Sequence, residues 1–162
     1  MHHSFDQDIF YRAVPEYKLE DGHTILDIGA HIGVFSLFTA VNNTQGRVFA
    51  IEPCSDTYAV LEKNISDNAL QQVTSYKLAL SGEKGSSKLF YDIETGNWGH
   101  SLTHQFSEEG EMAPTDTLDI FFEQQQIDQC HFIKLNYEGS EFSILMNASS
   151  QTLKKVDKIL VI

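Results

Sequence analysis

TILDIGAHIG, residues 24–33, is the stretch that decides the fold of this chain. It begins with a short apolar run typical of a buried β-strand and passes through Asp27 into a turn bracketed by Gly29 and Gly33. Residues 34–41 continue with apolar side chains at helical spacing. A strand, a glycine turn and a helix in this order are typical of the first part of a nucleotide-type pocket in a doubly wound α/β sheet. Backbone N–H groups at the start of the helix can face an anion there.

Further along the chain, strand patterns alternate with helix patterns. Four more apolar runs predict core strands, at residues 47–52, 73–80, 131–135 and 158–162. Residues 88–91 predict a short edge strand. Strands that alternate with helices predict a mainly parallel sheet with helices on both faces.

Helical spacing of apolar residues separates these strands. Residues 34–41 predict a helix, and residues 55–68 predict another with Ser55 as its N-cap. The apolar side chains at helical positions are predicted to face the core: Val34, Leu37, Phe38 and Val41 in the first helix, Tyr58, Leu61 and Ile65 in the second, and Leu118, Phe121, Phe122, Phe142, Leu145 and Met146 in two later ones.

The length of 162 residues suits one domain with a substantial core. Residues 1–18 predict a lead-in helix or flap, and residues 19–162 predict the α/β domain. Residues 94–115 form the longest stretch without periodicity, and they include His100 and His104. Long irregular segments in compact domains often cover functional sites, so we expect this one to contact a substrate.

Composition excludes several classes of partner. Lys and Arg total 11 and Asp and Glu total 23, which gives a net charge of −12. Such a charge repels phosphate backbones and anionic membranes, so we expect neither nucleic acid nor a membrane as a partner. The two cysteines lie far apart and lack metal-ligand spacing, and no apolar h-region or membrane span is visible. We therefore expect a cytoplasmic protein with no metal site.

The first turn and the end of the second strand carry the chemistry. The turn offers G-x-x-x-G and lacks the G-x-G-x-x-G spacing of dinucleotide sites, so a nucleotide-dependent oxidoreductase fits the fold but not the glycines. Glu52 ends the second strand, 25 residues after Asp27, where a carboxylate can accept hydrogen bonds from ribose hydroxyls. A glycine turn that binds nothing is the alternative, and Glu52 favours the functional interpretation.

The motifs LDIGAHIG, VFAIEP, LEKNISDN, LALSG and FIKLNYEGSEFSIL stand in this order along the chain. In order and spacing they resemble the motifs of FkbM-type methyltransferases, a branch of the class I enzymes that depend on S-adenosylmethionine. The resemblance covers residues 19–162. It implies a Rossmann-like, doubly wound fold, here expected to lack the C-terminal antiparallel hairpin that class I methyltransferases usually have.

The resemblance also implies S-adenosylmethionine as the cofactor and assigns residues to it. The turn residues would form the cofactor loop, namely Asp27, Gly29, Ala30, His31 and Gly33. Glu52 would hold the ribose hydroxyls, and Pro53 with Cys54 would shape the adenine pocket. Ala79 and Leu80 would lie against the adenine.

The fourth strand departs from the family pattern K-[IL]-D-[VI]-E-G-[AS]-E, because Asn136 stands where that pattern has aspartate. An asparagine cannot act as a general base, although it can orient a substrate hydroxyl or the cofactor's amino group. We predict that Asn136, Glu138 and His100 are the catalytic residues. Glu141 and His104 are further candidate bases. For Glu138 and Glu141 the alternative role is structural, since acidic residues stabilise the start of the following helix.

Together these observations predict an S-adenosylmethionine-dependent O-methyltransferase that acts on a hydroxyl of a small molecule, a sugar or a secondary metabolite. The alternative that Asn136 suggests is a weakened or inactive cofactor-binding module. The last strand predicts an unpaired sheet edge, through which we expect a homodimer to form.

Overall fold

The computed structural model describes residues 18–91, 100–101, 110–137 and 140–162. Its central sheet has the strand order β3-β2-β1-β8-β9, and every neighbouring pair is parallel. The strands are β1 (Thr24–Ile28), β2 (Arg47–Ile51), β3 (Val73–Tyr76), β8 (Phe132–Leu135) and β9 (Ile159–Val161). The strand order reverses beside β1, which confirms the predicted doubly wound α/β fold.

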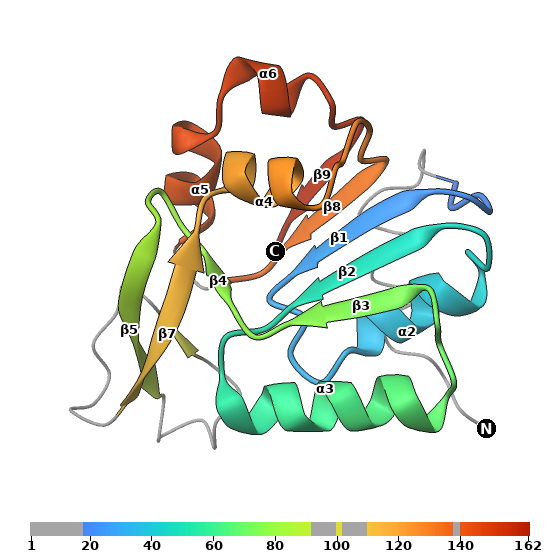
Figure 1. Cartoon of the computed structure of the whole chain (residues 1–162), viewed down its shortest axis with the longest axis horizontal. Coiled ribbons are helices and arrows are strands. Elements are labelled where there is room, and N and C mark those ends of the chain that lie inside the picture. Colours follow the sequence, from blue (N-terminus) through green and yellow to red (C-terminus); the bar gives the residue numbers. More distant parts are fainter. Residues whose placement is uncertain (1–17, 92–99, 102–109, 138–139) are drawn as a thin grey trace.

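Helices cover both faces of this sheet (Figure 1). On one face lie α2 (Val34–Val41) and α3 (Ser55–Asp67), and on the other lie α4 (Leu118–Gln124), α5 (Glu141–Asn147) and α6 (Ser150–Leu153). Each face buries its own cluster of apolar side chains, one around Phe121 and Phe122 of α4 and one around Phe35 of α2 and Leu61 of α3. None of the helices in the described ranges is long and apolar enough to cross a bilayer.

A second sheet packs beside the first, with the order β4-β7-β5-β6 (Figure 1). Its strands are β4 (Ala79–Leu80), β5 (Gly85–Tyr91), β6 (His100–Ser101) and β7 (Gly110–Asp116). β4 runs parallel to β7, and β5 is antiparallel to both β7 and β6.

This second sheet corrects three sequence predictions. The single strand predicted over residues 73–80 is two strands in two different sheets. The strand predicted over residues 88–91 begins at Gly85 and lies between two partners, so it is not an edge. The stretch predicted to be irregular, residues 94–115, contains most of β7. Each error has the same cause, because the pairing partner that defines the strand lies far away in the sequence.

The buried faces of two helices also differ from the prediction. In α2, Val34 and Val41 are exposed, and the helix buries Phe35, Ser36, Thr39 and Ala40. In α5, Phe142 and Met146 are exposed and Ile144 is buried. Apolar residues occupy several faces of both short helices, so spacing alone does not select the buried one.

The start of α3 lies one residue away from its predicted place. Cys54 is the N-cap, and Ser55 is the first helical residue. The lead-in segment predicted over residues 1–18 lies outside the described residues except for Lys18.

Candidate functional site

The glycine turn after β1 lies at the carboxyl edge of the central sheet. Gly29 has a φ of +76°, and a Cβ placed on it would come within 2.0 Å of the backbone oxygen of Asn136. Gly33 has a φ of +91°, and a Cβ there would approach a methyl group of Leu61 to 2.5 Å. Both positions therefore require glycine, for backbone angle and for space.

Asp27 lies directly beneath this turn and is fully buried. Its Oδ1 accepts a hydrogen bond of 2.8 Å from Lys134 Nζ, and its Oδ2 accepts one of 2.7 Å from Ser36 Oγ. The same ammonium group donates to the backbone oxygen of Gly29 at 3.0 Å. Asp27 thus joins β1, α2 and β8, and it fixes the turn from below.

Glu52 follows β2, the neighbour of β1, and is 4% exposed. Its Oε2 accepts a 2.8 Å hydrogen bond from the backbone N–H of His31. Its Oε1 accepts bonds of 2.9 Å from the N–H of Cys54 and from Thr57 Oγ1. The carboxylate therefore couples the glycine turn to the start of α3, where Pro53 is also buried.

Asn136 follows β8, the other neighbour of β1, and its side chain is exposed. Its backbone N–H donates to the oxygen of Ile28 at 3.0 Å, which holds it against the glycine turn. Glu52, the turn and Asn136 therefore lie at the carboxyl ends of three adjacent strands, β2, β1 and β8.

Tyr137 follows Asn136 and extends beneath this edge, where it is buried. A Cβ on Gly29 would lie 3.1 Å from its ring, and its hydroxyl donates to the backbone oxygen of Leu78 at 3.3 Å. Burial is the main cause that raises the pKa of Tyr137 well above its usual value, and the negative charge of the nearby Glu52 carboxylate is the second. The phenol stays protonated and acts as a hydrogen-bond donor in this edge.

Ala79 and Leu80 lie further from the turn along the chain, in β4 of the second sheet. Both side chains are fully buried, and Leu80 belongs to the core cluster around Phe121. Ala30 is buried, and His31 is partly buried with a φ of +52°.

Several predicted catalytic residues lie outside the described part of the structure. Glu138 and His104 are among them, and His100 is described only as a residue of β6. Glu141 is the first residue of α5, and its Oε1 accepts a 2.7 Å hydrogen bond from the N–H of Tyr137. Glu141 thus stands at the start of the helix, the position from which its structural alternative was argued.

Three polar partners of the predicted residues were missed by the sequence analysis: Ser36, Thr57 and Lys134. A lysine inside a buried strand was a usable signal, because a buried ammonium group requires an anionic partner. The two hydroxyl groups gave no comparable signal, since serine and threonine occur throughout helices and helix starts.

Comparisons with known proteins identify the family of this chain. The family model of the methyltransferase FkbM domain matches residues 27–162. A hexuronic acid methyltransferase, AglP, of Haloferax volcanii is 27% identical over 96% of this chain and 61% of its own length. Methyltransferase 1 of Beauveria bassiana is 22% identical over 87% of this chain and 64% of its own length.

Solved structures share the fold. A precorrin-6y C5,15-methyltransferase from Geobacter metallireducens aligns with a TM-score of 0.55 at 13% identity, over 96% of this chain and 61% of that one. A SAM-dependent methyltransferase from Aquifex aeolicus aligns with a TM-score of 0.51 at 14% identity, over 93% of this chain and 61% of that one. The chain thus spans less than two thirds of the length of these relatives and neighbours. Because the family model covers most of its residues, the chain belongs to the FkbM methyltransferase family.

Proposed function

We propose that this chain is an S-adenosylmethionine-dependent methyltransferase that methylates a hydroxyl of a small molecule, a sugar or a secondary metabolite. The arrangement of Glu52, the glycine turn and Asn136 on three adjacent strand ends is the observation that carries the proposal. The crevice at the carboxyl ends, where strand order reverses, is the usual ligand site of an open α/β sheet.

The chemistry of these groups fits the cofactor. A carboxylate offers about four acceptor positions, and Glu52 uses three of them for protein donors, so it can accept a further bond from a ribose hydroxyl. The exposed amide of Asn136 can both donate to a carboxylate and accept from an ammonium group. Polar groups for both ends of S-adenosylmethionine thus occur on one edge.

S-adenosylmethionine, when bound, supplies a methyl group already activated by its sulfonium charge. The chain's own residues then need mainly to hold an acceptor oxygen in line with that methyl group, because alignment contributes much of the rate. Asn136 can orient a hydroxyl but cannot take its proton, so we expect the proton to leave to water or to one of the candidate bases, Glu138 or His100, as the methyl group transfers. The relative named for hexuronic acid supports a sugar as the acceptor, and the relatives do not favour an inactive binding module.

Calorimetric titration with S-adenosylhomocysteine tests the cofactor assignment. We expect binding by the unaltered chain and weaker binding by Glu52→Gln, because the amide is a poorer acceptor for ribose hydroxyls. Glu123→Gln is the matched control, since Glu123 is exposed on α4. The proposal is wrong if the unaltered, folded chain does not bind S-adenosylhomocysteine at millimolar concentration, or if it binds reduced nicotinamide dinucleotide instead.

A further inference from the structure

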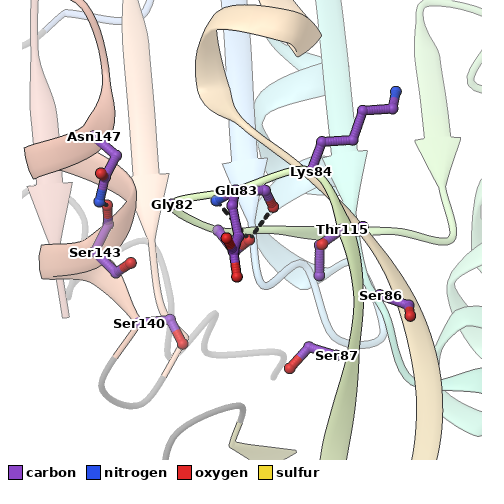
Figure 2. A pocket seen from close by; sticks show the side chains of 11 residues that line it. Gly82, Glu83, Lys84, Ser86, Ser87, Thr115, Ser140, Ser143 and Asn147 are labelled. Atoms are coloured by element: carbon purple, nitrogen blue, oxygen red, sulfur yellow. Dashed lines mark hydrogen bonds between the residues drawn. The ribbon is translucent and has the colours of Figure 1, made fainter.

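A cavity of about 380 Å³ lies between α5 and the loop that joins β4 to β5. Figure 2 shows Ser140, Ser143 and Asn147 on the α5 side of this cavity, across from Ser87 and Thr115 on the second sheet. The volume is within the range of about 300–1,000 Å³ that is typical of small-molecule sites. Ser140 follows Asn136 by four residues in the sequence.

The lining of the cavity consists of small polar residues. Five serines, Thr115 and Asn147 supply hydroxyl and amide groups, and the described lining includes no aliphatic or aromatic side chain larger than that of threonine. Its charged residues, Glu83 and Lys84, are of opposite sign and exposed. A hydroxyl donates one hydrogen bond and accepts others, so this wall matches a polyhydroxylated ligand better than an apolar ring or an anion.

Ser140 gives an independent indication of a ligand. The residue is 2% exposed, yet its Oγ has no hydrogen-bond partner, although Ser140 stands at the N-cap position of α5. At the equivalent position of α6, Ser149 Oγ accepts a 3.2 Å bond from the N–H of Thr152. A buried hydroxyl without a partner is costly, so a ligand hydroxyl in the cavity would satisfy it.

Gly82 brings the β4–β5 loop close to α5 at the same cavity. A Cβ on Gly82 would lie 2.7 Å from Asn147 Nδ2 and 2.8 Å from Ser143 Oγ. Both atoms belong to side chains that line the cavity and can rotate. A large side chain at position 82 would therefore take up space in the cavity while leaving the backbone of α5 in place.

We propose that this cavity binds the methyl acceptor, that the acceptor is a sugar or a similar polyol, and that Ser140 Oγ pairs with one of its hydroxyls. The assignment of the ligand as acceptor rests on the proposed function, whereas the preference of the cavity for a polyol rests on its own lining.

Saturation-transfer NMR with methyl α-D-glucopyranoside, in the presence of saturating S-adenosylhomocysteine, tests this site. We expect a signal from the unaltered chain, a signal reduced about fivefold in Ser140→Ala, as for the loss of one hydrogen bond, and none in Gly82→Leu. Ser140→Ala should keep its melting temperature, because the hydroxyl it removes has no partner in the free protein. Ser149→Ala is the control, and it should lower the melting temperature without changing the sugar signal.

The outcomes separate this inference from the proposed function. Absence of a sugar signal while S-adenosylhomocysteine is bound overturns the site, and so does a signal that survives both substitutions or is displaced by catechol, an aromatic diol. Failure of S-adenosylhomocysteine to bind overturns the proposed function instead. A sugar signal that persists without cofactor binding, and that is reduced in Ser140→Ala and lost in Gly82→Leu, supports the polyol site alone.

Discussion

The ion pair between Lys134 and Asp27 links β8 to β1 directly beneath the glycine turn. Both side chains are buried, and Lys134 Nζ also contacts the oxygen of Gly29 and lies 5.8 Å from the centre of the Phe35 ring. Removing one partner of a buried pair leaves an uncompensated charge. The pair therefore determines the position of the turn as well as the stability of the sheet.

We expect Lys134→Met to lower the free energy of unfolding by about 3–5 kcal/mol, because Asp27 remains buried without its cation. Urea unfolding followed by circular dichroism measures this loss. The exposed pair of Lys63 and Asp67 provides the control, and Lys63→Met should cost less than about 1 kcal/mol. A double variant, Lys134→Met with Asp27→Asn, should recover part of the loss, and no recovery would contradict the ion-pair explanation.

We propose that cofactor binding and catalysis separate at Asn136. It is exposed at the strand end, so Asn136→Asp should fold normally. We expect the unaltered chain to methylate an acceptor slowly and Asn136→Asp to raise kcat by about tenfold or more, because a positioned base contributes about 10²–10⁴-fold. The kcat of both proteins is measured from the transfer of a labelled methyl group from S-adenosylmethionine to each of a panel of sugars. Cofactor binding without turnover in either protein would instead support a binding module.

For single residues, the sequence predicted where the site residues lie in the fold better than it predicted their hydrogen-bond partners. The places of Gly29, Glu52 and Asn136 followed from strand ends and glycine spacing, which are local features. The three donors that surround Glu52 come from the turn and from the start of α3, and only the folded chain brings them together.

Among the elements, β7 is joined to the start of α3 by Glu111. Its carboxylate accepts a 2.5 Å bond from the N–H of Ser55 and a further bond from Ser55 Oγ, which itself accepts from Lys77 Nζ at 2.5 Å. Burial raises the pKa of Glu111, but the hydrogen bonds from Ser55 and Cys54 and the nearby Lys77 ammonium group together outweigh it, so the pKa is lowered overall. This contact attaches β7 of the second sheet to α3, which covers one face of the central sheet.

A carboxylate with a lowered folded-state pKa stabilises the protein above its unfolded-state pKa and loses that effect as the pH falls through the folded value. We expect Glu111→Gln to lower the free energy of unfolding at pH 7 by about 1 kcal/mol, because hydrogen bonds to a charged group contribute about 1.5–3 kcal/mol and solvent screens this partly exposed carboxylate. The difference in the free energy of unfolding between Glu111→Gln and the unaltered chain should shrink below pH 4.5, the ordinary pKa of a glutamate carboxyl group. A difference that is the same at pH 7 and at acid pH would contradict this role, and Glu123→Gln should change nothing.

Elements defined by local patterns were predicted well, and those defined by distant partners were not. β1, β2, β8 and β9 are short apolar runs, and their bounds were close to the prediction. β4 separates from β3 only because β7 pairs with it, and no pattern near residues 79–80 indicates that partner. The buried face of α2 includes Ser36 and Thr39, whose hydroxyls bond to Asp27 and to the backbone oxygens of Phe35 and Ser36.

At the scale of the whole molecule, β9 is an outer strand of the central sheet that the described residues form. It has one strand partner, β8, within the described residues, and its Ile159 and Val161 are 38% and 51% exposed. An unpaired edge with apolar side chains is a template for pairing with another strand. We propose that a second copy of this chain pairs there, β9 with β9 across a two-fold axis, the symmetry most common among homodimers.

The net negative charge of each copy opposes this dimer, so its formation should depend on salt concentration. Each copy carries a net charge of −12, so two copies repel, and salt shortens the range of that repulsion to about 3 Å at 1 M. We therefore expect light scattering to show a dimer fraction that rises with protein concentration and with added sodium chloride. Val161→Lys places a charge on the edge and should abolish the dimer, whereas Val60→Lys, at an exposed valine of α3, should leave it intact. A monomer at every concentration in high salt, or a dimer that Val161→Lys does not weaken, would show that copies do not pair through β9.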